Sequence, residues 1–173
     1  LFVPEKYRSS AYTDSPLPIG ENQTISQPYI VAYMTEALEL KKSDKILEIG
    51  TGSGYQAAIL GEIVSEVYTI ELIPTLGNRA GKLLDDLGYD NVHVRVGDGY
   101  KGWPDKAPFD AVIVTCAPED IPEPLIRQLR EGGKMIIPVG EQYRVQRLII
   151  GKKKNGKLHT ENVMSVSFVP MVE

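Results

Sequence analysis

The sequence predicts an α/β fold: a doubly wound, mostly parallel sheet with helices on both faces and an antiparallel hairpin at its C-terminal end. From position 45 onward, short apolar strands alternate with helical segments, which is typical of a parallel sheet. A glycine-rich turn follows the first of these strands. Asn155-Gly156 separates the last two strands, as expected for the turn of a tight hairpin.

The first 20 residues are rich in proline, serine and tyrosine. Pro16 and Pro18 disfavour a helix, so we expect an ordered, extended loop there. A helix should follow, with Ser26 as its N-cap and Pro28 in its first turn. The apolar residues that share one face of this helix are Ile30, Val31, Met34 and Leu38.

The central region supplies the parallel sheet. We expect strands over 45–49, 67–71, 91–96, 109–115 and 134–139. Helices are expected over 57–64, from Pro74 to a terminating Gly88, and over 122–130, where Gly132-Gly133 would end the helix. Strands over 147–150 and 163–169 would form the terminal hairpin, with a solvated run of lysines at 152–157.

Composition limits the function classes. The 173 residues are 42% hydrophobic and 24% charged, which fits one globular domain. The net charge of -4 and the lack of a basic stripe disfavour a nucleic-acid partner. A single cysteine indicates a reducing compartment and no zinc cluster. Without a membrane-length apolar run or a signal-peptide pattern, we expect a cytoplasmic protein that does not bind membranes.

The glycine-rich turn is the first candidate binding element. Its glycines allow the backbone to turn sharply and to approach a ligand without Cβ clashes. In open parallel sheets, ligands bind at the carboxyl ends of the strands, where the strand order reverses, and this turn lies at such an end. Tight packing alone is the other reading of the turn. The candidate ligand-binding residues are Gly50, Thr51, Gly52, Ser53 and Gly54.

Acidic residues at three consecutive strand ends indicate the ligand. Gly54 comes one residue too early for a dinucleotide fingerprint, and Glu48 would repel a pyrophosphate but suits a cation. Glu71 can accept both ribose hydroxyls of a nucleoside, and Asp98 is placed for an adenine edge. Each acid alone could be a solvated strand end or a helix cap. Together they predict a pocket for S-adenosylmethionine, whose sulfonium and ammonium are cationic.

This order of acids and glycines resembles the class I S-adenosylmethionine methyltransferases, whose sheet is Rossmann-like. The flanking segments resemble the protein-L-isoaspartate O-methyltransferase family, and the resemblance covers nearly the whole chain. Thr24-Ile25-Ser26 is the segment most specific to that family. Further matching segments are Leu1-Phe2-Val3-Pro4-Glu5, Ala11-Tyr12-Thr13-Asp14, Pro16-Leu17-Pro18-Ile19-Gly20, Gly52-Ser53-Gly54-Tyr55, Gly97-Asp98-Gly99, Phe109-Asp110-Ala111, Ile137-Pro138-Val139-Gly140 and Phe168-Val169-Pro170.

The resemblance implies roles for individual residues. Thr24, Ile25 and Ser26 would line the substrate pocket, with Ser26 beside the reacting carboxylate unless it only caps its helix. A peptide groove would involve Val3, Pro4, Val169 and Pro170. The chain would then form one methyltransferase domain: a substrate-side loop segment (1–27), a cofactor-binding core (28–140) and a C-terminal hairpin region (141–173). The positions that match the family's cofactor site are Glu48, Gly50, Gly52, Glu71, Asp98 and Gly99.

The implied reaction transfers a methyl group from S-adenosylmethionine to the free carboxylate of an L-isoaspartyl residue in damaged proteins and peptides. It leaves S-adenosylhomocysteine and needs no metal, and the ester converts through a succinimide towards normal aspartate. The acceptor is already ionised, because its pKa is about 3.9, so no general base is required. We therefore interpret His93 as a structural strand residue, His159 as exposed and Cys116 as a small buried filler.

Three other functions are compatible with parts of the pattern. A class I methyltransferase acting on a small molecule or RNA is the nearest, but an RNA enzyme should show a basic face. An NAD-dependent oxidoreductase would need a different glycine spacing. An inactive binding module would not need the loop at 24–26. We expect a monomer, and we hypothesise that Asn155-Gly156 forms isoaspartate as the protein ages and is then methylated by the enzyme itself.

Overall fold

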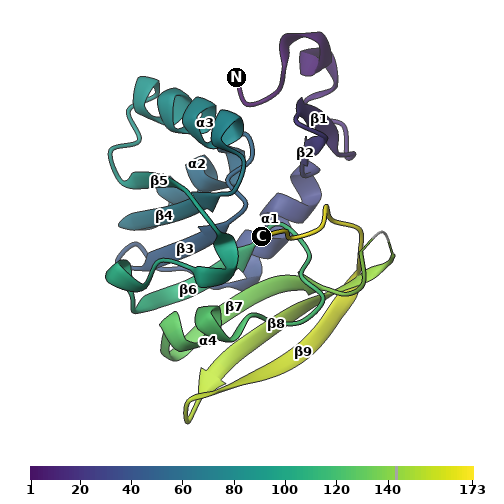
Figure 1. The fold of residues 1–173 in the computed structure, drawn as a ribbon. Coiled ribbons are helices and arrows are strands. Elements are labelled where there is room, and N and C mark those ends of the chain that lie inside the picture. The colour runs from purple at the N-terminus through teal and green to yellow at the C-terminus, as the bar shows by residue number, and fades with distance from the viewer. Residues whose placement is uncertain (143) are drawn as a thin grey trace.

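The computed structural model describes residues 1–142 and 144–173, and it shows a seven-stranded sheet with helices on both faces (Figure 1). The strand order is β5-β4-β3-β6-β7-β8-β9. From β3 the chain builds outward to β5 and then returns to β6, so the strand order reverses between β3 and β6. The predicted doubly wound sheet is confirmed. Its parallel strands are β3 (Lys45–Ile49), β4 (Glu66–Glu71), β5 (Val92–Val96), β6 (Phe109–Val114) and β7 (Leu129–Val139).

Two apolar cores lie on the two faces of this sheet. Helices α1 (Pro28–Ala37), α2 (Tyr55–Gly61) and α3 (Pro74–Asp86) contribute to one core, together with alternate residues of the central strands. Helix α4 (Glu123–Gln128) contributes Leu125 to the other. Strands covered on both faces are expected to be almost entirely apolar, as β6 is. Among the described residues, no helix is long and apolar enough to cross a membrane.

The predicted C-terminal hairpin is confirmed, and its strands β8 (Gln146–Lys154) and β9 (Lys157–Val166) are longer than expected. Asn155 and Gly156 form its turn with φ values of 52° and 74°. The prediction of a solvated lysine run is wrong for Lys153. Its Nζ donates to the carbonyl oxygens of Ile126 (2.8 Å) and Leu129 (2.6 Å), because the end of α4 leaves carbonyls without helical partners.

The N-terminal region has more structure than the predicted extended loop. It contains the 3-10 helix η1 (Glu5–Ser10) and a small antiparallel hairpin of β1 (Leu17–Gly20) and β2 (Gln23–Ile25). Glu21 and Asn22 make the turn with φ values of 53° and 56°. Sequence reasoning missed this hairpin because its strands are short and Glu21 is unusual at a left-handed position.

Two predicted helix boundaries are also wrong. Ser26 is not an N-cap: α1 begins at Pro28, so Gln27 takes the cap position, without a side-chain hydrogen bond. Gly132-Gly133 does not end a helix, because α4 stops at Gln128 and both glycines lie within β7. Gly132 has φ +77°, and there the β6–β7 register shifts, which is typical of a β-bulge.

Candidate functional site

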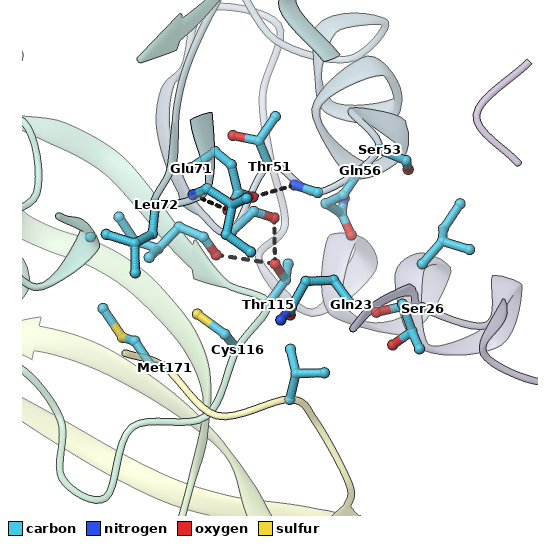
Figure 2. A pocket seen from close by; sticks show the side chains of 18 of the residues that line it. Gln23, Ser26, Thr51, Ser53, Gln56, Glu71, Leu72, Thr115, Cys116 and Met171 are labelled. Carbon is cyan, nitrogen blue, oxygen red and sulfur yellow. Dashed lines mark hydrogen bonds between the residues drawn. The ribbon is translucent and has the colours of Figure 1, made fainter. Parts of the chain in front are cut away.

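A cavity opens at the carboxyl ends of β3, β4 and β6, where the strand order reverses, and it encloses about 930 Å³ when the solvent space at its mouth is included (Figure 2). Its walls include residues 23–26, 49–53, 70–73, 115–116 and 169–172. Ligands of open α/β sheets bind at this position. The structure thus brings the glycine turn, Glu71 and the loop at 24–26 together around one space.

The glycine turn forms the floor of the cavity in a shape that only glycines adopt easily. Gly50, Gly52 and Gly54 all have left-handed backbone angles, with φ values of 97°, 54° and 86°. A Cβ atom at Gly50 would lie 2.5 Å from Thr115 Oγ1. Gly50, Thr51, Gly52 and Ser53 line the cavity, whereas Gly54 begins α2 behind it.

Glu71 is fixed at the wall of the cavity by two backbone amides. Its Oε2 accepts a hydrogen bond from the N–H of Gly52 at 2.7 Å, and its Oε1 accepts one from the N–H of Ile73 at 3.0 Å (Figure 2). The residue is 7% exposed. A carboxylate oxygen has more than one acceptor position, so both oxygens can still accept hydrogen bonds from a ligand. Glu71 is therefore a rigid, pre-oriented acceptor.

Thr115 joins the two strands at the reversal point. Its Oγ1 lies 2.7 Å from the carbonyl oxygen of Gly50 and 3.1 Å from that of Ile49, and the hydroxyl donates across β6 to β3 (Figure 2). Sequence reasoning missed this residue, although a lone polar side chain after an apolar strand is a detectable signal. Cys116 also lines the cavity; burial, with the carboxylates of Glu71 and Glu48 nearby, raises its pKa to about 12. The thiol therefore stays protonated. The prediction of a buried filler is wrong in one respect, because Cys116 is only partly buried and faces the cavity.

Glu48 lies beneath the glycine turn and does not line the cavity. Its side chain is fully buried, and within the described part of the chain neither carboxylate oxygen has a hydrogen-bond partner. Burial raises its pKa to about 8. Glu48 is consequently a mostly neutral carboxylic acid at pH 7 in the unliganded protein, whereas the sequence predicted a carboxylate anion.

Asp98 also does not line the cavity, although the adjacent Gly99 does. Its Oδ1 accepts a hydrogen bond from the N–H of Tyr100 at 2.9 Å, and its Oδ2 lies 3.1 Å from Lys101 Nζ. The carboxylate thus organises the loop that carries Gly99. A Cβ atom at Gly99 would lie 2.5 Å from Ile49 Cγ2, so this loop packs closely on β3.

The substrate-side residues divide between two adjoining spaces. Thr24, Ile25 and Ser26 line the main cavity, and Ile25 and Ser26 also line a neighbouring hollow of about 470 Å³. Val3 lines that second hollow, whereas Pro4 lines neither. Among the described residues, we find no hydrogen-bond partner for the Ser26 hydroxyl, which leaves it available to a ligand.

Val169 and Pro170 complete the wall of the main cavity from the C-terminal end. This segment is held beside the end of β6, because Ala117 N–H donates to Val169 O and Met171 N–H donates to Ala117 O, each at 2.8 Å. Sequence reasoning anticipated Val169 and Pro170. It missed further lining residues, among them Gln23, Tyr55, Gln56, Leu72, Met171 and Val172.

The β1–β2 hairpin lies against the cavity, and two contacts attach it to the rest of the protein. Ile19 is 2% exposed, and its Cδ1 lies 3.3 Å from where a Cβ atom of Gly52 would be. Arg79 of α3 donates from Nη2 to the carbonyl oxygen of Ile19 at 2.6 Å. The hairpin that leads to Ser26 is thereby fixed to the helix that follows Glu71.

The site offers hydroxyls, backbone amides and one oriented carboxylate. In the described part of the chain, no group of three or more histidine, cysteine, aspartate or glutamate side chains could hold a metal ion. His93 lies in β5, where its Nε2 is 2.6 Å from Glu66 Oε2 and its ring stacks on Tyr68. His159 is exposed on β9. Neither histidine is among the described residues that line the cavity.

Comparison with known proteins gives a consistent result. The sequence profile of the protein-L-isoaspartate(D-aspartate) O-methyltransferase family matches residues 1–173. The protein-L-isoaspartate O-methyltransferase of Opitutus terrae is 57% identical over 98% of this chain and 72% of its own length. That of Gloeobacter violaceus is 55% identical over 98% of this chain and 83% of its own length.

Solved structures agree with this match. A protein-L-isoaspartate O-methyltransferase superimposes with a TM-score of 0.92 at 32% identity; the alignment covers 99% of this chain and 57% of the other. A Plasmodium falciparum protein described as a protein-L-isoaspartate O-methyltransferase, in complex with S-adenosyl-L-homocysteine, superimposes with a TM-score of 0.81 at 27% identity. That alignment covers 99% of this chain and 84% of the other.

Proposed function

The chain belongs to the protein-L-isoaspartate O-methyltransferase family and is a methyltransferase that uses S-adenosylmethionine, and we propose that the cavity at the β3/β6 reversal holds cofactor and substrate together. The reaction is methyl transfer to the free carboxylate of L-isoaspartyl residues in damaged proteins and peptides. The observation that carries the proposal is the position of Glu71, which two backbone amides orient at the cavity wall.

The cofactor half of the cavity is assigned to the glycine turn, Glu71 and Gly99. Glu71 accepts hydrogen bonds from the ribose hydroxyls, and Gly50, Thr51, Gly52 and Ser53 let the backbone approach the amino-acid part. Gly54 contributes by starting α2 at a left-handed angle. Asp98 acts through the loop that it organises and places Gly99 beside the adenine. When bound, S-adenosylmethionine supplies an electrophilic methyl group and leaves as S-adenosylhomocysteine.

Glu48 is assigned an electrostatic role behind the turn. It has no partner among the described residues, and a buried polar group without one is unfavourable unless binding supplies compensation. A cationic ligand above the turn would favour the ionised form of the Glu48 carboxyl and lower its pKa from about 8. The carboxyl would then release a proton as the cofactor binds.

The substrate half of the cavity is assigned to Thr24, Ile25, Ser26, Val169 and Pro170. The Ser26 hydroxyl donates to the acceptor carboxylate and replaces part of its water shell. Positioning of the carboxylate in line with the methyl group can lower the activation free energy by roughly 7–11 kcal/mol. The neighbouring hollow, with Val3 in its wall, receives the flanking peptide, and the assignment of Pro4 to this groove rests on the family resemblance alone.

The proposal also covers the division of the chain, the partners of the enzyme and its cellular setting. The segment at 1–27 serves the substrate, 28–140 serves the cofactor and 141–173 completes the sheet. The partners are isoaspartyl peptides and damaged proteins, without nucleic acid or membrane, and the enzyme acts as a monomer in the cytoplasm. A net charge of -4 and a single cysteine support this setting.

The test uses two synthetic peptides that differ only in one aspartyl or isoaspartyl linkage. With labelled S-adenosylmethionine, we expect the label on the isoaspartyl peptide alone, as a base-labile ester. Label on neither peptide, although S-adenosylhomocysteine binds, would overturn the substrate assignment. Label on a small molecule or RNA instead would favour another class I methyltransferase.

A further inference from the structure

The tip of the β8–β9 hairpin is held by a carboxylate from a neighbouring strand. Glu131 of β7 accepts a hydrogen bond on Oε1 from the backbone N–H of Asn155 and on Oε2 from that of Gly156, the latter at 3.2 Å. None of these three residues lines the cofactor cavity. The contact therefore has no part in the methyl transfer described above.

The residues in this turn can form an isoaspartyl bond. The backbone nitrogen of Gly156 can attack Cγ of Asn155; the new N–C bond forms as the amide proton is lost and the side-chain amide leaves as ammonia. Water then opens the succinimide at either carbonyl and gives an aspartyl or an isoaspartyl linkage. Both residues are exposed, so water reaches them, and glycine presents no side chain to obstruct the attack.

Glu131 opposes the first step in two ways. The attacking nitrogen must lose the proton that it donates to Glu131, and a nearby carboxylate makes the resulting amide anion less favourable. The attack also requires rotation about the Cα–C bond of Asn155, because this torsion, together with that of the Cα–Cβ bond, sets the distance from the Gly156 nitrogen to Cγ. The pairing of Lys154 with Lys157 and both Glu131 contacts restrict this rotation.

We propose that Asn155–Gly156 is a latent isoaspartate-forming site and that Glu131 keeps it closed in the folded protein. The backbone amide that must attack, that of Gly156, is one of the two that Glu131 binds. The Asn-Gly sequence alone marks the turn as a site of rapid deamidation, whereas the structure assigns it a specific protecting residue. The proposal is independent of the function proposed above, because it concerns deamidation without any cofactor.

The test follows deamidation of the purified full chain during storage at mildly alkaline pH without S-adenosylmethionine. Peptide mapping by mass spectrometry measures aspartyl and isoaspartyl products at Asn155 in the wild type, Glu131→Gln and Glu161→Gln. The last variant loses the same charge from β9, and Glu161 makes no hydrogen bond to the turn amides among the described residues. We expect Glu131→Gln to deamidate about tenfold faster than the wild type, the factor for one lost charge-assisted hydrogen bond, and Glu161→Gln to match the wild type.

Amide hydrogen exchange provides a second readout that does not depend on the covalent step. Exchange at Gly156 should be faster in Glu131→Gln than in the wild type, while exchange in β3 stays unchanged because the fold is intact. Deamidation of Glu131→Gln at the wild-type rate would overturn the proposal. Slower deamidation would also overturn it, since Glu131 would then act as a base that promotes the attack.

Discussion

Glu71 Oε2 accepts a hydrogen bond from the backbone N–H of Gly52 at 2.7 Å and so ties the end of β4 to the glycine turn that follows β3. The contact fixes the acceptor before any ligand arrives, and pre-orientation of this kind lowers the cost of binding. Other residues hold this pair in place or act beside it in the cavity.

Gly77 of α3 should be needed for the position of Glu71. A Cβ atom at Gly77 would lie 2.9 Å from Val96 Cγ2 and 3.2 Å from Glu71 Cβ. We expect Gly77→Ala to lower the free energy of unfolding by about 1–3 kcal/mol and to weaken binding of S-adenosylhomocysteine. Thermal unfolding and calorimetry measure the two effects.

Gly81→Ala on the same helix is the matched control. Its Cβ atom would meet only Val94, at 3.7 Å or more, which is ordinary contact. The substitution should raise the free energy of unfolding by about 0.5–1 kcal/mol through helix propensity and leave the affinity unchanged. Equal behaviour of the two variants would contradict the role given to Gly77.

Ser26→Ala should lower turnover far more than stability. Ser26 is not the cap of α1, so removal of its hydroxyl breaks no helix contact. Loss of one fixed donor to the reacting group is expected to reduce kcat by roughly 100-fold, with little change in cofactor affinity. Steady-state kinetics with an isoaspartyl peptide checks this; a drop in Tm with unchanged kcat would remove Ser26 from the mechanism.

Glu48 should make the stability of the unliganded protein depend on pH. Its folded pKa of about 8 exceeds the value of 4.5 expected when unfolded, so the folded state binds more protons between these limits. The protonated carboxyl makes its full contribution to the free energy of unfolding below pH 4.5, and this contribution is lost as the pH rises through 8. The slope is at most about 1.4 kcal/mol per pH unit.

Glu48→Gln tests this prediction because it keeps the shape and removes the ionisation. In urea titrations at several pH values, the free energy of unfolding of the wild type should fall relative to that of the variant from pH 4.5 to 8. Parallel curves for the two proteins would show that Glu48 ionises as readily in the folded state as in the unfolded state.

Arg79→Ala should affect the peptide substrate more than the cofactor. Arg79 fixes the β1–β2 hairpin through the carbonyl oxygen of Ile19, and that hairpin leads to Thr24 and Ser26. We expect a higher KM for an isoaspartyl peptide, by about tenfold for one charge-assisted hydrogen bond. The control is Lys82→Ala on the same helix, which loses only a surface ion pair with Asp86. An equal KM in both variants would exclude a role for the hairpin tether.

Much of the fold could be predicted from local patterns. Short apolar runs placed β3 and β6 within a residue of their observed bounds, and Asn155-Gly156 located the hairpin turn. The β1–β2 hairpin could not be predicted, since the contacts that stabilise it join residues as distant as Ile19 and Arg79. The bulge at Gly132 likewise depends on the register of β6 against β7.

The site was only partly readable from the sequence. Gly50 and Glu71 were found because their residue types and spacing indicate a ligand, and Ser26 was found because the segment at 24–26 resembles the family. All three line the cavity. The complete burial of Glu48 and the hydrogen bond from Tyr100 N–H to Asp98 could not be predicted, because spacing along the chain does not show which way a side chain points. Thr115 escaped notice because its bond to Gly50 crosses between two strands.

The most direct test of this account is a calorimetric titration of S-adenosylhomocysteine into the wild type and Glu71→Gln. Glu66→Gln, at the other end of β4, serves as the control. We predict affinity about 10- to 100-fold lower for Glu71→Gln, which corresponds to roughly 1.5–3 kcal/mol for a charged acceptor, and unchanged affinity for Glu66→Gln. Wild-type affinity in a folded Glu71→Gln would contradict the assignment of Glu71 as the group that anchors the cofactor.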